Sequence, residues 1–334
     1  MNIIAWLFAY PFIWQTILSS LFTFGLVWSL VRILAIRDAG VKAWVFTLPI
    51  LVPLLLPFKG QIGFIHWLSL LISEPDALLD LTGAARFLTL LCILPPVLLI
   101  GRGMVSYLAY CWVLRKVQEI TANDEPRLFL LLASLAEKAG ISLPRVYQLP
   151  SRHAQVFVCG IRRPRLVISP LLLSALPEAE LEGVLAHEVA HLARRDQIAS
   201  WVISLVSALM FYNPLLYPLV RRLNHEREKA ADFLASQLTG QPRALAQGLL
   251  TVAKLALEEQ REFYSPALPI AKLTSGEAIY ERTRILWSEK EEPHGQIITQ
   301  AWRFGVLFLS IEGLFIVFVL NPFLQHAACA VMVP

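Results

Sequence analysis

Two histidines and a glutamate stand at a spacing that could hold and use a metal ion. In the stretch LAHEVAHLARRD, His187 and His191 are four residues apart and Glu188 follows the first histidine. Residues four apart on an α-helix lie on one face, about one turn apart, so both imidazole rings can bind one ion. Glu188 would stand beside that ion. The spacing predicts a helical metal site with an adjacent carboxylate.

A third ligand is expected because zinc in catalytic sites usually takes three protein ligands and keeps one position open. The nearest downstream carboxylates, Glu226 and Glu228, lie in RRLNHEREKAAD. Glu228 and Asp232 are one turn apart on a helix, so Glu228 would bind the ion while Asp232 would hold a ligand histidine through its other ring nitrogen. We predict one zinc ion per chain, bound by His187, His191 and Glu228.

These residues suit the hydrolysis of a peptide bond. Zinc would acidify a water molecule toward a pKa of about 7 and polarise a peptide carbonyl as a Lewis acid. Glu188 would take the proton of the water and pass it to the leaving amine. His225 could contact the oxyanion or the substrate, although a solvated surface histidine explains its position equally well. HExxH also occurs by chance, but the helical pattern around it and the following ExxAD segment favour a real site.

The composition places the chain in a membrane. Of 334 residues, 56% are hydrophobic and 16% are charged, and the mean hydropathy is +0.59, whereas soluble domains carry about 25% charged residues. The lipid bilayer is therefore an expected partner. The formal net charge is +4, but no basic patch stands apart from the membrane flanks, so we expect no nucleic-acid partner.

Four apolar stretches are predicted to cross a hydrocarbon core about 30 Å thick. They cover residues 3–31, 43–58 and 87–114 of an N-terminal membrane region (1–114), and residues 304–321. Residues 115–303 form the predicted polar domain, and residues 322–334 form a short tail. Lysine and arginine concentrate in loop 32–42 and in residues 102–303. The positive-inside rule therefore places both regions in the cytoplasm and both termini outside.

A fifth apolar run, residues 199–220, lies inside the polar domain. A simple crossing would put Glu228 across the membrane from His191, yet both must reach one ion. The run must therefore return, either by dipping into the membrane or by lying buried in the domain. Asn213-Pro214 is the predicted break, because the residue before a proline disfavours helix. Glu312 lies inside the last span, where an ionisable group needs a partner or a cavity.

An ordered set of motifs carries a family resemblance. GIRRPRLVISP, LEGVLAHEVAHLARRD, an apolar run with Asn-Pro, RRLNHEREKAAD and YERTRIL together resemble the membrane zinc metallopeptidases of the BlaR/MecR type, the bacterial β-lactam sensor-transducers. The pattern is that of a gluzincin, shared more loosely with HtpX and the CAAX-prenyl endopeptidases. The resemblance covers about residues 1–325, and its specific part is 155–235. It implies the same ligands and base, and a location in the bacterial cytoplasmic (inner) membrane.

The resemblance also implies how a substrate peptide would bind. The peptide would add as a strand beside the sheet that precedes the zinc helix, through main-chain hydrogen bonds. The corresponding edge here would be Ala154, Gln155, Val156, Phe157 and Val158. BlaR/MecR proteins continue past the last span into a penicillin-binding domain, whereas this sequence ends in NPFLQHAACAVMVP without an SxxK motif. We therefore expect no β-lactam sensing by acylation.

The expected fold is an α-helical integral membrane protein with about four spanning helices and a cytoplasmic α+β gluzincin zinc-metalloprotease domain. This domain should contain a small sheet, formed by RVYQLP and AQVFVCGIRRPRLVISP, and the re-entrant or buried segment 199–220.

Two functional classes remain open. The first is an integral-membrane zinc endopeptidase that cleaves a cytoplasmic or membrane-proximal protein or peptide, in regulated proteolysis or signalling. The second is a non-proteolytic regulatory or scaffold protein with a structural zinc site. This second type of protein would work with a separate sensor subunit. A separate sensor or regulatory partner and self-association into a homo-oligomer are both left as possibilities. The intact Glu188 favours the first, because a structural site needs no base.

Overall fold

The computed structural model describes residues 11–55, 117–149, 154–160, 164–262, 276–288 and 297–315, with short pieces at 97–98, 101, 103–105 and 108. The chain divides into two compact units. The first, called the helical unit, comprises Met1–Ser106, Val202–Asn224 and Pro293–Pro334; the second, called the motif unit, comprises Tyr107–Trp201 and His225–Glu292. Helices α11 (Asp196–Leu209) and α12 (Leu216–Thr239) each contribute residues to both units.

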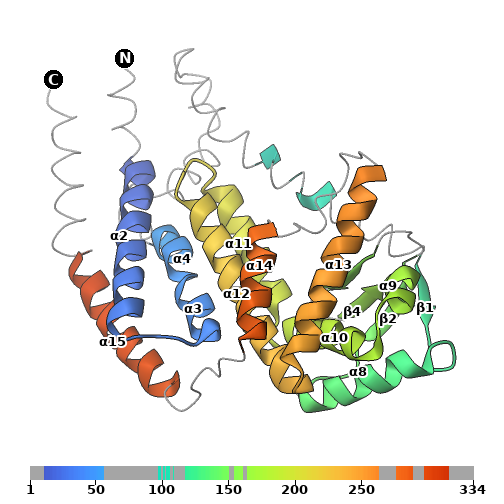
Figure 1. Cartoon of the computed structure of the whole chain (residues 1–334). Helices are drawn as coiled ribbons and strands as arrows, with labels where there is room; N and C mark the ends of the chain where they lie inside the picture. The colour runs from blue at the N-terminus through green and yellow to red at the C-terminus, as the bar shows by residue number, and fades with distance from the viewer. Residues whose placement is uncertain are drawn as a thin grey trace, which may run out of the picture. The chain divides into compact units, whose positions relative to one another are not determined.

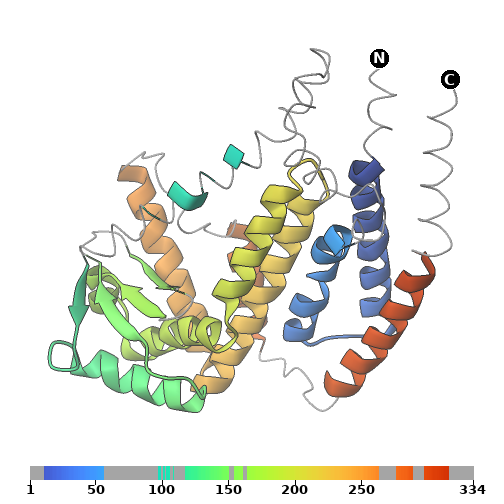
Figure 2. The same cartoon turned by 180° about the vertical axis from the view of Figure 1, so that it is seen from behind.

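Helix α2 (Pro11–Ile33) is the centre of the helical unit. It packs against α4 (Leu48–Leu55) and α15 (Ile297–Phe315), and the three helices lie side by side in Figures 1 and 2. The apolar core of this unit also includes the end of α11 and the start of α12. Its most deeply buried side chains include Val27, Phe46, Ile50, Met210 and Leu223.

The predicted membrane spans agree with the described helices to different degrees. Within the part of the chain that the structure describes, Thr16–Ile33 is the one stretch long and apolar enough to cross a membrane, judged by length and composition. It agrees with the predicted first span. The predicted second span is divided, because α3 (Ala39–Val45) ends before α4 begins and Pro49 occupies the first turn of α4. The third predicted span lies mostly outside the described residues, so the number of four spans stays a prediction.

The first part of the last predicted span, residues 304–315, lies in a helix that begins before it, and residues 316–321 lie outside the described residues. Helix α15 begins at Ile297, before the predicted start of the span at residue 304, because hydropathy marks the apolar part of a helix and not its first turn. Glu312 in this helix is only 4% exposed, and its Oε1 atom accepts a hydrogen bond from Thr23 Oγ1 in α2 at 2.9 Å. The carboxyl group therefore has the partner that its position requires.

The apolar run 199–220 turns back, as the sequence predicts. Helix α11 ends at Leu209 and α12 begins at Leu216, with Asn213 and Pro214 in the turn between them. The two helices lie side by side in both views (Figures 1 and 2). Nη1 of Arg227 in α12 donates to Oγ of Ser200 in α11 at 2.9 Å, so the start of the run lies beside the chain that follows it.

A four-stranded sheet lies in the motif unit. Its strands are β1 (Gln118–Ile120), β2 (Arg145–Gln148), β3 (Val156–Cys159) and β4 (Arg165–Ile168), in the order β1-β2-β4-β3. The parallel pair is β2 with β4, and the other two pairs are antiparallel. The small sheet was predicted, but β1 was not. Strand β3 lies at an edge of the sheet.

Helices pack around helix α10 (Glu178–Ala193), which carries the two histidines. It contacts β3, α8 (Pro126–Lys138) and α13 (Pro242–Glu262), and α13 in turn contacts α14 (Gly276–Trp287). Figure 1 shows α8, α10, α13 and the short α9 (Pro170–Ala175) grouped around the strands. Helices α10 and α13 approach closely at Gly183, where an added Cβ would lie 2.8 Å from the Leu245 Cα atom. The position of α10 is therefore set by tight packing.

Candidate metal centre

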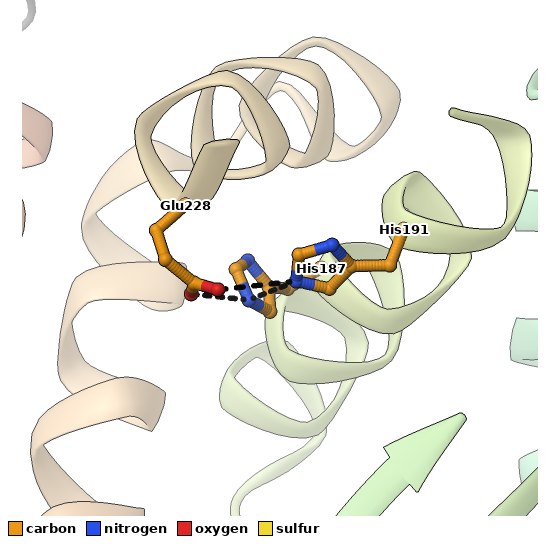
Figure 3. A group of neighbouring side chains, drawn as sticks. All are labelled: His187, His191 and Glu228. Carbon is orange, nitrogen blue, oxygen red and sulfur yellow. Dashed lines mark hydrogen bonds and ion pairs between the residues drawn. The ribbon is translucent and has the colours of Figure 1, made fainter. Parts of the chain in front are cut away.

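Helix α10 presents both histidines toward a carboxylate on another helix. His187 and His191 lie on one face of α10, and Glu228 comes from α12 (Figure 3). The Nε2 atoms of the two rings are 3.2 Å apart. Oε2 of Glu228 lies 3.5 Å from Nε2 of His187, and Oε1 lies 3.8 Å from Nε2 of His191. Three potential ligand side chains thus converge on one point.

The spacing of these atoms fits one tetrahedral zinc ion. Two ligand atoms that are each 2.0–2.1 Å from such an ion stand about 3.3 Å from one another. The two histidine nitrogens are 3.2 Å apart, and the two oxygens of the Glu228 carboxylate lie 3.5 Å from one nitrogen and 3.8 Å from the other. Two imidazole rings and one carboxylate are also a frequent donor set for catalytic zinc. The residues therefore fit zinc in both geometry and chemistry.

Each histidine is held by an aspartate at its other ring nitrogen. Nδ1 of His187 lies 2.9 Å from Oδ1 of Asp232, and Nδ1 of His191 lies 2.7 Å from Oδ2 of Asp196. A carboxylate beside Nδ1 favours a proton on that nitrogen, which would leave the Nε2 lone pair to face the ion. Asp232 was predicted to hold a ligand histidine at its other ring nitrogen. Asp196, which ends the quoted stretch LAHEVAHLARRD, was not predicted to take part in the site.

Arg282 from α14 completes the charge balance of the centre. Its Nε and Nη2 atoms contact the two oxygens of Asp232, each at 2.7 Å, and its Nη1 atom lies 3.0 Å from Oε2 of Glu228. The side chain is 7% exposed. Arg282 lies in the quoted motif YERTRIL, but no spacing rule connects it to residues 50 positions away. Arg282 was therefore not among the predicted site residues.

A second arginine, on α12, connects this helix to the turn that follows α10. Arg227, the residue before Glu228, donates from Nη2 to the backbone oxygen of Asp196 and from Nη1 to Ser200 Oγ. Its Nε atom lies 3.5 Å from Oδ1 of Asp196. These contacts join the start of α11 to α12 immediately beside the proposed ligand Glu228. They too were missed, because they depend on how the two helices meet.

The protonation of the centre follows from burial and charge. Burial alone would lower the pKa of His187, but its contacts with Asp232 and Glu228 outweigh burial and raise the pKa to about 10. A metal ion bound at Nε2 would displace that proton. Burial raises the pKa of Glu188, the residue beside the ligands, against the opposing effect of the two histidines. A raised pKa suits a carboxylate that exchanges a proton near neutral pH.

The remaining candidate residues have other surroundings. Nε2 of His225 lies 3.0 Å from Oε2 of Glu281, which also contacts Lys229 Nζ at 2.8 Å; a role toward substrate stays a prediction. Val156, Phe157 and Val158 lie in the edge strand β3, and Ala154 and Gln155 precede it. Strand β3 contacts α10. A role for this edge in substrate binding also stays a prediction.

The comparison with protein families agrees with this geometry. The model of the family described as BlaR1 peptidase M56 matches residues 77–257, which is more than half of the chain. The chain belongs to this family. The matched segment contains the HExxH motif and Glu228. The resemblance drawn from the motifs is therefore confirmed at the level of the family.

Curated relatives extend the likeness to HtpX-type proteins. The chain is 35% identical over 170 residues to a protein named Protease HtpX homolog from Acaryochloris marina. It is 32% identical over 178 residues to the homolog from Nostoc punctiforme and 35% identical over 165 residues to that from Acidiphilium cryptum. These matches cover 40%, 42% and 39% of this chain and 58%, 61% and 57% of the relatives. The chain thus spans less than two thirds of their length.

Proposed function

We propose that this chain is an integral-membrane zinc-dependent endopeptidase. The observation that carries the proposal is the convergence of the His187 and His191 Nε2 atoms with the Glu228 carboxylate, beside Glu188 on the same helix as the histidines. Membership of the BlaR1 peptidase M56 family and the likeness to proteases named HtpX homolog support it. The apolar helix α2 and the composition support a membrane location.

The residues of the chain divide the work of peptide hydrolysis. His187, His191 and Glu228 would hold the zinc ion, which supplies a Lewis acid that polarises the scissile carbonyl and acidifies a water molecule. Glu188 would accept the proton of that water and deliver it to the leaving amine. Asp232 and Asp196 fix the orientation of the rings, and Arg282 holds the carboxylates of Glu228 and Asp232 in place.

The edge strand β3 is the proposed docking place for the substrate backbone. Its pairing partner is β4, with Val156 opposite Ile168 and Val158 opposite Leu166. The order of the sheet puts β3 at an edge, and the strand contacts α10, which carries the base. An extended peptide added there would make main-chain hydrogen bonds beside the catalytic helix. The proposed substrates are cytoplasmic or membrane-proximal proteins, cleaved in regulated proteolysis or signalling at the cytoplasmic face of a bacterial inner membrane.

Replacement of the base tests the proposal. Glu188→Gln should keep bound zinc and lower cleavage of a random library of quenched-fluorescence peptides about 100-fold or more, the scale of a general base. Glu182→Gln, a partly exposed change on the same helix, is the matched control. Undiminished cleavage by Glu188→Gln would contradict the assigned base.

Protein fragments can be compared between native host cells that carry the parent protein and cells that carry the Glu188→Gln variant. Fragments found only with the parent protein would identify substrates. A parent protein that binds zinc and cleaves neither the library nor any host protein would instead favour a regulatory or scaffold role with a structural zinc site.

A further inference from the structure

The turn between α11 and α12 has its polar groups satisfied in a way that suits an apolar environment. Asn213 is 3% exposed. Its backbone N–H donates to Met210 O, and its backbone oxygen accepts from Leu216 N. Its side-chain Oδ1 accepts from Leu215 N at 3.0 Å. Irregular backbone at membrane depth is tolerated only where protein groups satisfy it in this way.

The side chains of the turn bind a polar stripe on α2. Thr16, Ser20 and Thr23 lie on one face of α2, and each is at most 2% exposed. Nδ2 of Asn213 donates to Ser20 Oγ at 2.8 Å, and Thr16 Oγ1 donates to Tyr212 Oη at 3.2 Å. The turn therefore lies against the part of α2 that is apolar enough to cross a membrane.

Further along, α12 follows α2 toward its basic end. The guanidinium group of Arg222 lies 5.7 Å from the centre of the Trp28 ring, and that of Arg32 lies 4.9 Å from the same ring. Asn213 is hydrogen-bonded to Ser20, and the Arg222 guanidinium lies over the Trp28 ring. The segment from Asn213 to Arg222 and the segment from Ser20 to Trp28 therefore run in the same direction. The two arginines thus mark one end of the helical unit, where an arginine on each of two helices meets the same aromatic ring.

The depth of the turn follows from the length of α2. Ser20 precedes Arg32 by 12 residues of continuous helix, which is about 18 Å along the axis. If Arg32 stands at the edge of a hydrocarbon core about 30 Å thick, a group beside Ser20 lies beyond the middle of that core. A hairpin that enters from the side of Arg32 therefore reaches past the midplane before it returns.

The outer face of the hairpin is apolar and exposed. Ile203, Val206 and Met210 point into the core of the helical unit, whereas Val202, Leu205 and Tyr217 are exposed, Tyr217 by 74%. Helix α2 likewise exposes Leu18 and Leu21, and α15 exposes Val306 and Leu309. In water these side chains would form an extended exposed apolar surface. In a bilayer, acyl chains as apolar as the side chains would cover them, with no free-energy penalty for exposing apolar surface to water.

We propose that residues 202–220 form a re-entrant hairpin that enters the bilayer from the side of Arg32 and returns to it, with lipid acyl chains covering Val202, Leu205 and Tyr217. The inference rests on the proposed membrane location of α2 and identifies the partner of the exposed face as lipid. The turn at Asn213 is the inserted tip, and Thr16 and Ser20 replace the water that the tip would otherwise need.

Fluorescence quenching in liposomes tests this proposal. In full-length protein without its four native cysteines, a bimane label is placed singly at Leu205→Cys, Tyr217→Cys, Leu21→Cys on α2 and Leu130→Cys on α8. Lipids with brominated acyl chains should quench the labels at positions 205 and 217 as strongly as the label at 21. Iodide present on both sides of the membrane should quench only the label at 130, which is 74% exposed in the motif unit.

The control positions separate the two levels of the proposal. Quenching of position 21 by brominated lipid, together with quenching of positions 205 and 217 by iodide, would overturn the hairpin proposal and leave the membrane location intact. Quenching of position 21 by iodide alone would overturn the membrane location on which it rests. Retained peptide cleavage by the labelled variants verifies that each one is folded.

Discussion

The Nδ1 atom of His191 lies 2.7 Å from Oδ2 of Asp196, the first residue of the next helix. Helix α10 ends at Ala193, and Arg195 adopts a left-handed backbone conformation with φ 54°, which turns the chain so that Asp196 faces back toward His191. His187 has the equivalent contact from Asp232 on a helix that arrives later in the chain. One ring is thus held by a local turn and the other by tertiary packing.

The contact between His191 and Asp196 should support metal affinity. Asp196→Ala should weaken zinc binding about 10- to 100-fold, because the imidazole loses the group that fixes its tautomer and orientation. Competition with a chromogenic zinc chelator measures the change. Glu137→Ala, an exposed change on α8, is the control and should leave affinity unchanged. Equal zinc affinity in the Asp196 and Glu137 variants would show that the contact does not support the metal.

The ligand set predicts the metal content of the chain. Purified protein should contain about one zinc ion per chain, and a double His187→Ala/His191→Ala variant should contain almost none, because a single carboxylate cannot replace two imidazole ligands. Elemental analysis measures the content. His225→Ala should retain zinc, since this histidine pairs with Glu281. Full occupancy in the double variant would refute the assigned ligands.

Arg282 should stabilise the centre most strongly when zinc is removed. Arg282→Met would leave the buried carboxylate of Asp232 and the partly buried carboxylate of Glu228 without their cation, at a cost of about 3 kcal/mol. Bound zinc should reduce this loss, because the ion supplies positive charge to the same carboxylates. Thermal unfolding of zinc-free and zinc-loaded protein in detergent compares the two states. The control is Arg284→Met on the exposed side of α14; the same shift in both variants would count against Arg282.

The close approach of α10 and α13 should tolerate no added methyl group. At Gly183 a Cβ atom would lie 2.8 Å from Leu245 Cα and 2.9 Å from its backbone nitrogen. Because backbone cannot yield as a flexible side chain does, Gly183→Ala should destabilise the protein by about 2 kcal/mol. Gly25→Ala in α2, where nothing lies within 4 Å of the added Cβ, should be neutral to slightly stabilising, because alanine forms helix more readily than glycine. The melting temperatures of the two variants measure this difference. Equal melting temperatures would show that the close contact at Gly183 does not limit the side chain there.

The returning run 199–220 predicts the membrane side of its flanks. In protein without native cysteines, single cysteines at Arg194, Arg221 and Arg37 should resist an impermeant thiol reagent in intact cells, because all three lie on the predicted cytoplasmic side. A cysteine at Leu78 should react, because residues 59–86 join the predicted second and third spans on the side opposite loop 32–42, which is the outside. Reaction at position 221 without reaction at 194 would mean that the run crosses the membrane, and the shared metal site could not then form.

Local patterns were enough to predict several parts of this protein. Helical periodicity places His187, Glu188 and His191 on one helix, and the same rule relates Glu228 to Asp232. The break of the apolar run at Asn213-Pro214 follows from the backbone preferences around proline. Each of these inferences uses residues within a few turns of one another, where the geometry of a single helix or turn determines the spacing.

The tertiary structure alone decided the groups that hold the site together. The sequence contains no periodicity that relates Arg282 to Asp232, Arg227 to Ser200, or Thr23 to Glu312. Nor does a local pattern predict that β2 pairs with β4, and not with β3, the next strand along the chain. These contacts arise because helices and strands from separate parts of the chain pack by burying apolar faces, which is not directional. The sequence by itself thus identified the candidate ligands and base, whereas the packing of α10, α12 and α14 selected the charged side chains that orient them.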